Sequence, residues 1–381
     1  MTRTIDILSR LVAFDTVSSN SNLDLLTYVR DLARRLGGEA DIIPGAAPDK
    51  GSLWARFGPA GPGGVVLSGH SDVVPVAGQD WDTDPFEVVV RDDRAYGRGT
   101  ADMKGFVAAA LSALHDIDAA SLTRPIYLAL TYDEEVGCQG APHLIDWMRR
   151  AGVEADAVFV GEPTLMGVVN AHKGICVCRT EITGVEAHSS LSHHGVSAVG
   201  LAGRAIALLR DLEMEFRADL RDDRFAPDHA TISVNRIEGG EAVNILAGRC
   251  AFDWDIRPIP AVETSDVRDA FNERLETDVI EPARRMHAGV AASTTVIADA
   301  PGLAPEPDGG AETLAVRLTG RNKATAVPYA AEAGQYQAAG YSAVLVGPGS
   351  IDQAHQPNEW IALSELESCE GFVRRLGSAL A

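Results

Sequence analysis

The chain has 381 residues, of which 46% are hydrophobic, and a formal net charge of -21 at pH 7. This length predicts one large or two medium domains around a substantial core. The negative charge argues against nucleic acid and anionic membranes as partners, because both would repel the protein. No apolar run reaches the roughly 18 residues of a membrane span, and the first residues contain no signal segment, so we expect a cytoplasmic location.

Amphipathic patterns predict helices over residues 4–14 and 22–36, the second ended by Gly37 and Gly38. Short apolar runs then predict strands, with helical patterns between or after them. The strands are expected at 65–70, 125–132, 156–163 and 342–349, and the helices at 101–118, 139–150, 311–319 and 363–379. This alternation predicts an α/β domain with a mixed, mainly parallel sheet and helices on both faces.

Residues 174–288 have a different pattern, in which alternating segments such as ATISVNRIEGG accompany two helical stretches, 196–213 and 263–278. This pattern is typical of an α+β domain. We therefore predict a first domain made of residues 1–173 and 289–381, interrupted by an inserted second domain.

The five cysteines are too few, and an odd number, for a disulfide framework. Cys176 and Cys178 stand in the segment GICVCRTEI. Alternate residues of a strand point to the same face, so this spacing predicts strand residues rather than a metal-binding pair.

Six residues of metal-binding type lie at or just beyond the carboxyl end of a predicted strand, or at the helix start that follows one: His70, Asp102, Glu134, Glu135, Glu162 and His355. Ligands gather at this edge of an open α/β sheet. Imidazoles and carboxylates without a thiolate suit Zn²⁺, Co²⁺ or Mn²⁺. Each residue alone has an ordinary alternative, because strand-end histidines are usually structural and paired glutamates on loops are usually solvated. Only the joint placement favours a metal site.

A resemblance adds to this pattern. The segments SGHSDVVPV, WDTDPFE, YGRGTADMKG, TYDEEVGCQGA and GEPT occur in the order seen in the dinuclear-zinc amidohydrolase and peptidase family. The chain resembles that family over nearly its whole length. The segments GEPTLMGVVNAHKG, DIRPIP and LVGPGSIDQAHQPNEW resemble in particular those members that deacetylate N-acetyl-L-ornithine.

The resemblance implies two divalent metal ions, Zn²⁺ or alternatively Co²⁺. Asp102 would bridge them, His70 and Glu162 would complete one site, and Glu135 and His355 would complete the other.

The residues beside these ligands would have different roles. Asp72 would orient the His70 imidazole by accepting its second N–H. Glu134 would be the general base, taking a proton from the attacking water and passing it to the leaving amine.

The inserted domain contributes further candidates. His188, in GVEAHSSLSHHG, resembles a family histidine that stabilises the oxyanion and that reaches the partner subunit's site in dimeric members. The family usually has a small residue where Glu186 stands. Asn244 and Arg257 match positions that hold the substrate carboxylate, although a surface salt bridge remains the alternative for Arg257. Gly349, in the first domain, would offer a backbone N–H to the same carboxylate.

The activity implied is metal-dependent hydrolysis of an N-acyl amino acid, with N-acetyl-L-ornithine favoured, giving acetate and ornithine in arginine biosynthesis. Another N-acyl amino acid or a dipeptide stays open as the substrate, and a non-catalytic binding or regulatory module is the alternative of another class.

We also expect a homodimer built through residues 174–288, which would act as a lid and dimerisation domain. Its hinges are expected at Lys173-Gly174 and Ala288-Gly289.

Overall fold

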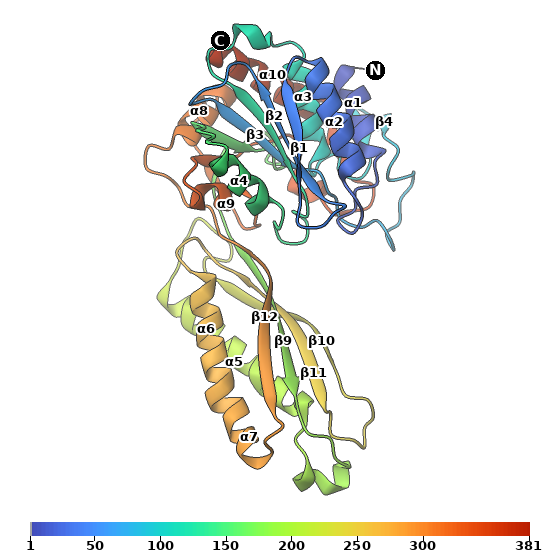
Figure 1. Cartoon of the computed structure of the whole chain (residues 1–381), viewed down its shortest axis with the longest axis vertical. Coiled ribbons are helices and arrows are strands. Elements are labelled where there is room, and N and C mark those ends of the chain that lie inside the picture. The colour runs from blue at the N-terminus through green and yellow to red at the C-terminus, as the bar shows by residue number, and fades with distance from the viewer. Residues whose placement is uncertain (1) are drawn as a thin grey trace. The chain divides into compact units, whose positions relative to one another are not determined.

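The computed structural model describes residues 2–381, which form two compact units (Figure 1). The first unit contains the residues up to Ala171, Leu303–Ala326 and Ala331–Ala381. The second contains His172–Gly302 and Val327–Ala330. No helix among the described residues is long and apolar enough to cross a membrane.

The first unit is built on an eight-stranded sheet with the order β1-β2-β6-β3-β7-β14-β8-β13. The strands are β1 (Glu39–Pro44), β2 (Gly51–Phe57), β3 (Val65–His70), β6 (Ile126–Thr131), β7 (Ala157–Val160), β8 (Val169–His172), β13 (Thr325–Val327) and β14 (Ala343–Leu345). The four central strands, β6, β3, β7 and β14, are parallel, whereas β2 is antiparallel to β6 and β8 to β14. Strands β3, β6 and β7 are buried along their whole length, which explains their continuous apolar sequences.

Helices cover both faces of this sheet, as the sequence predicted. The helices are α1 (Arg3–Val12), α2 (Leu23–Arg35), α3 (Lys104–Leu114), α4 (Ala141–Arg150), α8 (Gly310–Thr319), α9 (Ala333–Ala338) and α10 (Leu363–Leu380). The main core lies between one face and helices α1, α2, α3, α8 and α10. On the other face, Trp147 of α4 packs against Trp54 of β2, and Tyr336 of α9 hydrogen-bonds Ser68 of β3.

Short elements complete the first unit. A small sheet has the order β15-β5-β4, formed by β15 (Trp360–Ala362), β5 (Arg94–Tyr96) and β4 (Val89–Arg91). Two single turns of 3₁₀ helix are η1 (Ala119–Ser121) and η4 (Ile351–Gln353).

The second unit is an antiparallel sheet with helices against one face. Its strands are β9 (Ile175–Thr183), β10 (Thr231–Gly239), β11 (Arg249–Arg257) and β12 (Ala291–Ala300), in the order β10-β11-β9-β12. Its helical segments are η2 (Ser189–His194), α5 (Ala198–Asp219), α6 (Thr264–Arg274), the π-helical η3 (Leu275–Ile280) and α7 (Glu281–Met286). Cys176 and Cys178 lie on the buried face of β9 with their Sγ atoms 3.7 Å apart, as expected for strand residues.

The second unit extends further along the chain than expected. Strand β12 pairs with β9 along its length, so the chain returns to the first unit after Gly302 and not at residue 289. Gly289 precedes the start of β12, at the far end of that strand from Gly302. The expected hinge at Ala288-Gly289 is therefore misplaced. Gly174 and Gly302 lie side by side, because a Cβ added to Gly174 would be 2.8 Å from the Gly302 nitrogen.

Candidate metal centre

Five of the six ligand-type residues come together in two overlapping groups. One group is His70, Asp102 and Glu162, and the other is Asp102, Glu135 and His355. Within each group, one ligand atom from every residue lies within 4.8 Å of the others. Asp102 belongs to both.

The topology explains this meeting. His70 is the last residue of β3, Glu135 follows β6, Glu162 follows β7, and His355 follows β14. These four strands are parallel neighbours, so their carboxyl ends share one edge of the sheet. Asp102 lies in the turn before α3 at the same edge.

The Asp102 carboxylate faces the two histidines with different oxygens. Its Oδ1 lies 2.9 Å from His70 Nε2, and its Oδ2 lies 3.5 Å from His355 Nε2. His355 Nε2 also lies 2.8 Å from Glu135 Oε2. Asp102 thus directs one oxygen to each group of candidate ligands, as a ligand that bridges two cations must do.

Asp72 orients more than the His70 ring. Nδ1 of His70 lies 2.9 Å from the main-chain oxygen of Asp72, whereas the Asp72 carboxylate is 3.7 Å away. The expected contact with His70 is therefore mainly through the backbone. The carboxylate instead accepts the N–H groups of Glu134 at 3.1 Å and Glu135 at 3.3 Å, and the Ser18 hydroxyl at 2.7 Å. Asp72 thus fixes the turn that carries both glutamates.

Asp133, which directly precedes Glu134 and Glu135, has a partner that the sequence pattern did not indicate. Asp133 Oδ1 lies 2.6 Å from Nζ of Lys50, a buried residue that directly precedes β2. Asp133 has a left-handed φ of 54°, a conformation that is uncommon for residues other than glycine. Lys50 therefore neutralises Asp133. It does not pair with Glu134 or Glu135, whose negative charges need another positive partner.

The Asp102 turn is also held by a partner distant in the sequence. The Glu359 carboxylate accepts the N–H groups of Ala101 at 2.8 Å and Asp102 at 3.1 Å, and pairs with Arg98 at 2.8 Å. Both Arg98 and Glu359 are 1% exposed. Glu359 and Arg98 position Asp102, and sequence analysis missed both.

The donor set fits divalent cations. Glu135 Oε1 and Glu162 Oε1 are buried and have no hydrogen-bond partner among the described residues. Burial, followed by repulsion from Asp102, raises the pKa of Glu135 to about 8, and burial also raises the pKa of Glu162 well above its usual range. Cations at the two groups would supply both the missing partners and the missing positive charge.

Glu134 lies beside the ligand groups but belongs to neither. Burial, opposed by attraction to His70, raises the pKa of Glu134 to about 7. Its Oε1 accepts a hydrogen bond from the Cys138 thiol at 3.3 Å. A buried carboxyl with a pKa near neutrality is suited to take up and release a proton.

In the second unit, His188 and Asn244 come together. The Ser189 N–H donates to the Asn244 carbonyl at 2.9 Å, and His188 forms an isolated bridge with Ile245. Both His188 and Asn244 are exposed, and the His188 ring contacts the Ser190 hydroxyl at 2.7 Å.

Arg257 is not part of this pair. It ends β11, whereas the loop that carries Asn244 leads into the start of that strand. The nine residues of β11, which span about 26 Å at roughly 3.3 Å per residue, therefore lie between Arg257 and the Asn244 loop. Arg257 Nε instead lies 2.8 Å from the Asp255 carboxylate.

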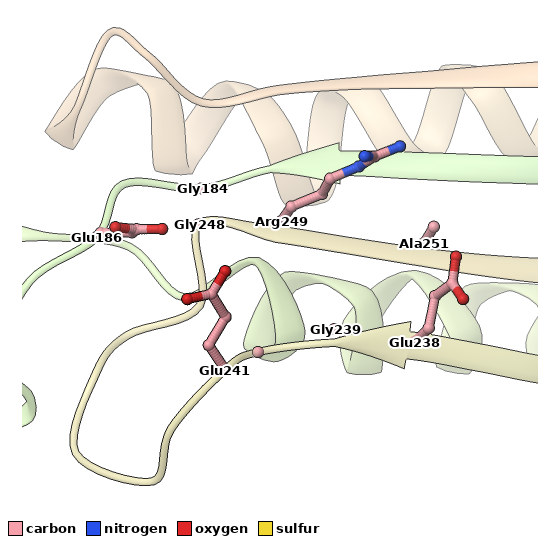
Figure 2. Close-up of a pocket in the computed structure, with 9 residues that line it drawn as sticks. Gly184, Glu186, Glu238, Gly239, Glu241, Gly248, Arg249 and Ala251 are labelled. Carbon is pink, nitrogen blue, oxygen red and sulfur yellow. The ribbon is translucent and has the colours of Figure 1, made fainter.

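The second unit contains a cavity of about 530 Å³, lined by residues close in sequence to His188 and Asn244 (Figure 2). Glu186 and Glu241 border it (Figure 2). A Cβ added to Gly248 would lie 2.6 Å from Glu186 Oε1. The Glu186 side chain, larger than the residue that the family usually has at this position, is accommodated because Gly248 has no side chain.

Gly349 adopts a left-handed φ of 86° beside the metal centre, where an added Cβ would lie 3.4 Å from that of Ala101. Its N–H donates to Glu365 at 3.3 Å. A substrate carboxylate would have to replace Glu365 as acceptor.

The fold and the site define a class: an α/β protein with two groups of carboxylates and imidazoles that could hold cations at the carboxyl edge of its sheet. Residues 66–378 match the sequence pattern of Peptidase family M20/M25/M40, and the chain belongs to this family. The resemblance seen in the sequence is thereby confirmed.

Two relatives are acetylornithine deacetylases. The enzyme of Photorhabdus laumondii is 34% identical over 381 residues, covering 98% of this chain and 96% of the relative. That of Pectobacterium carotovorum is 35% identical over 351 residues, covering 92% and 88%.

Solved structures confirm the expected fold class. An M20 family metallo-carboxypeptidase from Sulfolobus solfataricus has a TM-score of 0.78 and 17% identity, with 99% of both chains covered. A dinuclear metal-binding peptidase of the family from Bacillus subtilis has a TM-score of 0.65 and 16% identity, with 99% of this chain and 98% of the other covered.

Proposed function

We propose that the protein is a metal-dependent amide hydrolase that converts N-acetyl-L-ornithine into L-ornithine and acetate, a step of arginine biosynthesis. The observation that carries this proposal is the full-length similarity to acetylornithine deacetylases, 34% over 98% of the chain. The two groups of metal ligands that share Asp102 support the hydrolytic chemistry.

Five residues would hold the two cations, Zn²⁺ or Co²⁺. His70, Asp102 and Glu162 form one site, and Asp102, Glu135 and His355 form the other. When bound, the cations polarise the amide carbonyl and make water a better nucleophile near neutral pH.

Glu134 is the group that moves the proton. As water adds to the amide carbon, the Glu134 carboxylate takes one proton from it. The C–N bond then breaks, and Glu134 returns that proton to the departing nitrogen, which leaves as the amine of ornithine. The acyl group leaves as acetic acid, which loses its remaining proton to solvent or to the amine and becomes acetate, and Glu134 is again a carboxylate.

The second unit supplies groups for two different sites. Arg257 lies at the end of the unit where the chain enters and leaves, since the Gly174 N–H donates to the carbonyl of Pro258 next to Arg257. We assign Arg257 to the substrate carboxylate in its own subunit. His188 and Asn244, at the opposite end of β11, serve the partner subunit's site in a homodimer. His188 there stabilises the oxyanion.

A substrate panel tests the proposal. The purified protein is assayed with N-acetyl-L-ornithine, N-succinyl-diaminopimelate, N-acetyl-methionine and a dipeptide, each at several concentrations. The highest kcat/KM is expected for N-acetyl-L-ornithine. A clear preference for another member would identify a related deacylase or dipeptidase. No turnover of any member by metal-loaded protein would favour a non-catalytic module.

A further inference from the structure

Cys138 contacts Glu134 through both its backbone and its side chain. The Cys138 N–H donates to the Glu134 carbonyl at 2.8 Å, and the Cys138 thiol donates to Glu134 Oε1 at 3.3 Å. Cys138 is itself fixed from another element, because Nε2 of Gln335 in α9 donates to the Cys138 carbonyl at 2.9 Å. A chain of contacts therefore runs from α9 through Cys138 to the Glu134 carboxylate.

We propose that Cys138, supported by Gln335, is a positioning residue that holds the Glu134 carboxylate in place for proton transfer. The inference rests on the proposed function in one respect, namely that Glu134 moves the proton. It adds two residues, distant from each other in the sequence, that belong to neither group of candidate metal ligands.

The chemistry of a thiol suits this task. Cys138 is 2% exposed, and burial together with the nearby Glu134 charge raises the pKa of its thiol well above the usual value. The side chain is therefore an S–H donor and not a thiolate. A thiol is a weak donor, so it directs the carboxylate without placing a second full charge beside it.

Backbone conformation does not explain why cysteine occupies this position. Cys138 has a left-handed φ of 56°, and the preceding Gly137 has a φ of 107°. Glycine would adopt the conformation of residue 138 without strain, whereas a residue with a Cβ is disfavoured there. A side chain is thus retained at a position where the backbone alone favours glycine, and the contact of that side chain is with Glu134.

Two substitutions at one position separate positioning from folding. Cys138→Ala removes the donor, and Cys138→Ser keeps a hydroxyl donor. Both retain a Cβ, so the cost of the left-handed backbone is matched. In the metal-loaded enzyme, Cys138→Ala is expected to lower kcat by about 10- to 100-fold, the range typical of residues that orient a functional group. KM and metal content should stay near those of the wild type, and Cys138→Ser should recover part of kcat.

The support from α9 is tested by a double-mutant cycle. Gln335→Met removes the donor to the Cys138 carbonyl at similar side-chain length and should also lower kcat. If both residues act through Glu134, the losses in Cys138→Ala and Gln335→Met combine to less than their product. Independent, fully multiplicative losses would remove Gln335 from the proposal.

Cys369→Ala is the matched control, because Cys369 is a fully buried thiol of the same unit that lies in α10, in the core. It should lower thermal stability while leaving kcat unchanged. An equal fall of kcat in Cys369→Ala and Cys138→Ala would assign the effect to the loss of any buried thiol and would overturn the positioning role.

Infrared spectroscopy gives a readout that is independent of activity. The S–H stretch of Cys138, assigned by its disappearance in Cys138→Ser, should lie at a lower frequency than that of a thiol without a hydrogen bond. It should shift upward in Glu134→Gln, because a neutral amide is a weaker acceptor than a carboxylate.

An S–H band that does not shift in Glu134→Gln, or a kcat of Cys138→Ala equal to that of the wild type, would overturn the positioning role of Cys138. In that case, an inactive Glu134→Gln variant would still support the proposed function. Full activity in Glu134→Gln would overturn the proposed function itself.

Discussion

Asn244 and Arg257 lie near opposite ends of β11, separated by a strand of nine residues. A single N-acyl amino acid is too short to contact both within one copy of the second unit. If Asn244 and Arg257 of one subunit both bind substrate, they bind two different substrate molecules. His188, whose neighbour Ser189 hydrogen-bonds Asn244, would act on the same substrate molecule as Asn244. This arrangement makes sharing of sites between two subunits a testable property.

The first prediction is complementation between subunits. A heterodimer of His188→Ala with Glu134→Gln has one site with both lesions and one intact site if His188 acts on the partner. Activity should therefore return. The control heterodimer combines a wild-type subunit with a His188→Ala/Glu134→Gln double variant. Sharing leaves one lesion in each of its sites, so this dimer should be nearly inactive. The opposite pattern, an active control and no complementation, would place His188 in its own subunit's site.

The second prediction concerns removal of the metal. Chelation should abolish hydrolysis, and Zn²⁺ or Co²⁺ should restore it, because two buried glutamate oxygens have no hydrogen-bond partner in the part of the chain that the structure describes. Cations that bind only the folded protein should also raise its stability by about 2.7 kcal/mol at a free concentration of about 100 times Kd. Calorimetry with elemental analysis measures both effects. Full activity in protein shown to be free of metal would refute the mechanism.

The third prediction distinguishes the two adjacent glutamates. Glu134→Gln should retain its metal and lose about 10²- to 10⁴-fold in kcat, the usual range for a general acid–base group. Glu135→Gln should lose metal from the site that it shares with His355, because an amide is a poor replacement for a carboxylate ligand. Metal loss in Glu134→Gln together with metal retention in Glu135→Gln would show that the two roles are exchanged.

The meeting of most candidate ligand residues could be predicted from the sequence, because all of them except Asp102 end or follow a strand with a clear apolar pattern. His70 ends β3, Glu135 and Glu162 follow β6 and β7, and parallel strands bring their carboxyl ends together whatever the details of packing. The resemblance to the family is what predicts different roles for Glu134 and Glu135, because strand position alone does not distinguish the two residues.

The supporting residues could not be predicted in the same way, because their partners are distant in the sequence. Glu359 reaches Asp102 across 257 positions, and Gln335 reaches Cys138 across 197. No local pattern marks either residue. Strands β1 and β2 were also missed, although they extend the antiparallel side of the sheet. The second unit ends later than expected because β12 lies beyond the expected boundary, and its sequence AASTTVIADA has no regular apolar alternation that would mark it as a strand.

The fourth prediction tests the support beneath Asp102. Glu359→Gln leaves Arg98 buried without its counter-charge, so the free energy of unfolding should fall by about 3–5 kcal/mol. The double variant Arg98→Met/Glu359→Gln should be less destabilised than the single one, because no unpaired charge remains. Denaturant unfolding measures both variants. Equal stability of the single variant and the wild type would mean that the pair does not stabilise the Asp102 turn.

The last prediction concerns Arg257, whose Nε is held by Asp255 at 2.8 Å. This contact directs the guanidinium while leaving its terminal nitrogens to bind a carboxylate in a two-pronged geometry, which the point charge of lysine cannot reproduce. Arg257→Lys should therefore raise KM for N-acetyl-L-ornithine, with metal content unchanged and a smaller effect on kcat. Asp255→Asn should raise KM in the same direction, because Arg257 is then less well oriented. The control is Arg249→Lys, at the other end of β11, which pairs with Glu181 and should not change KM. An unchanged KM in Arg257→Lys for every N-acyl amino acid tested would place Arg257 outside the substrate site and would leave a surface ion pair with Asp255 as its role.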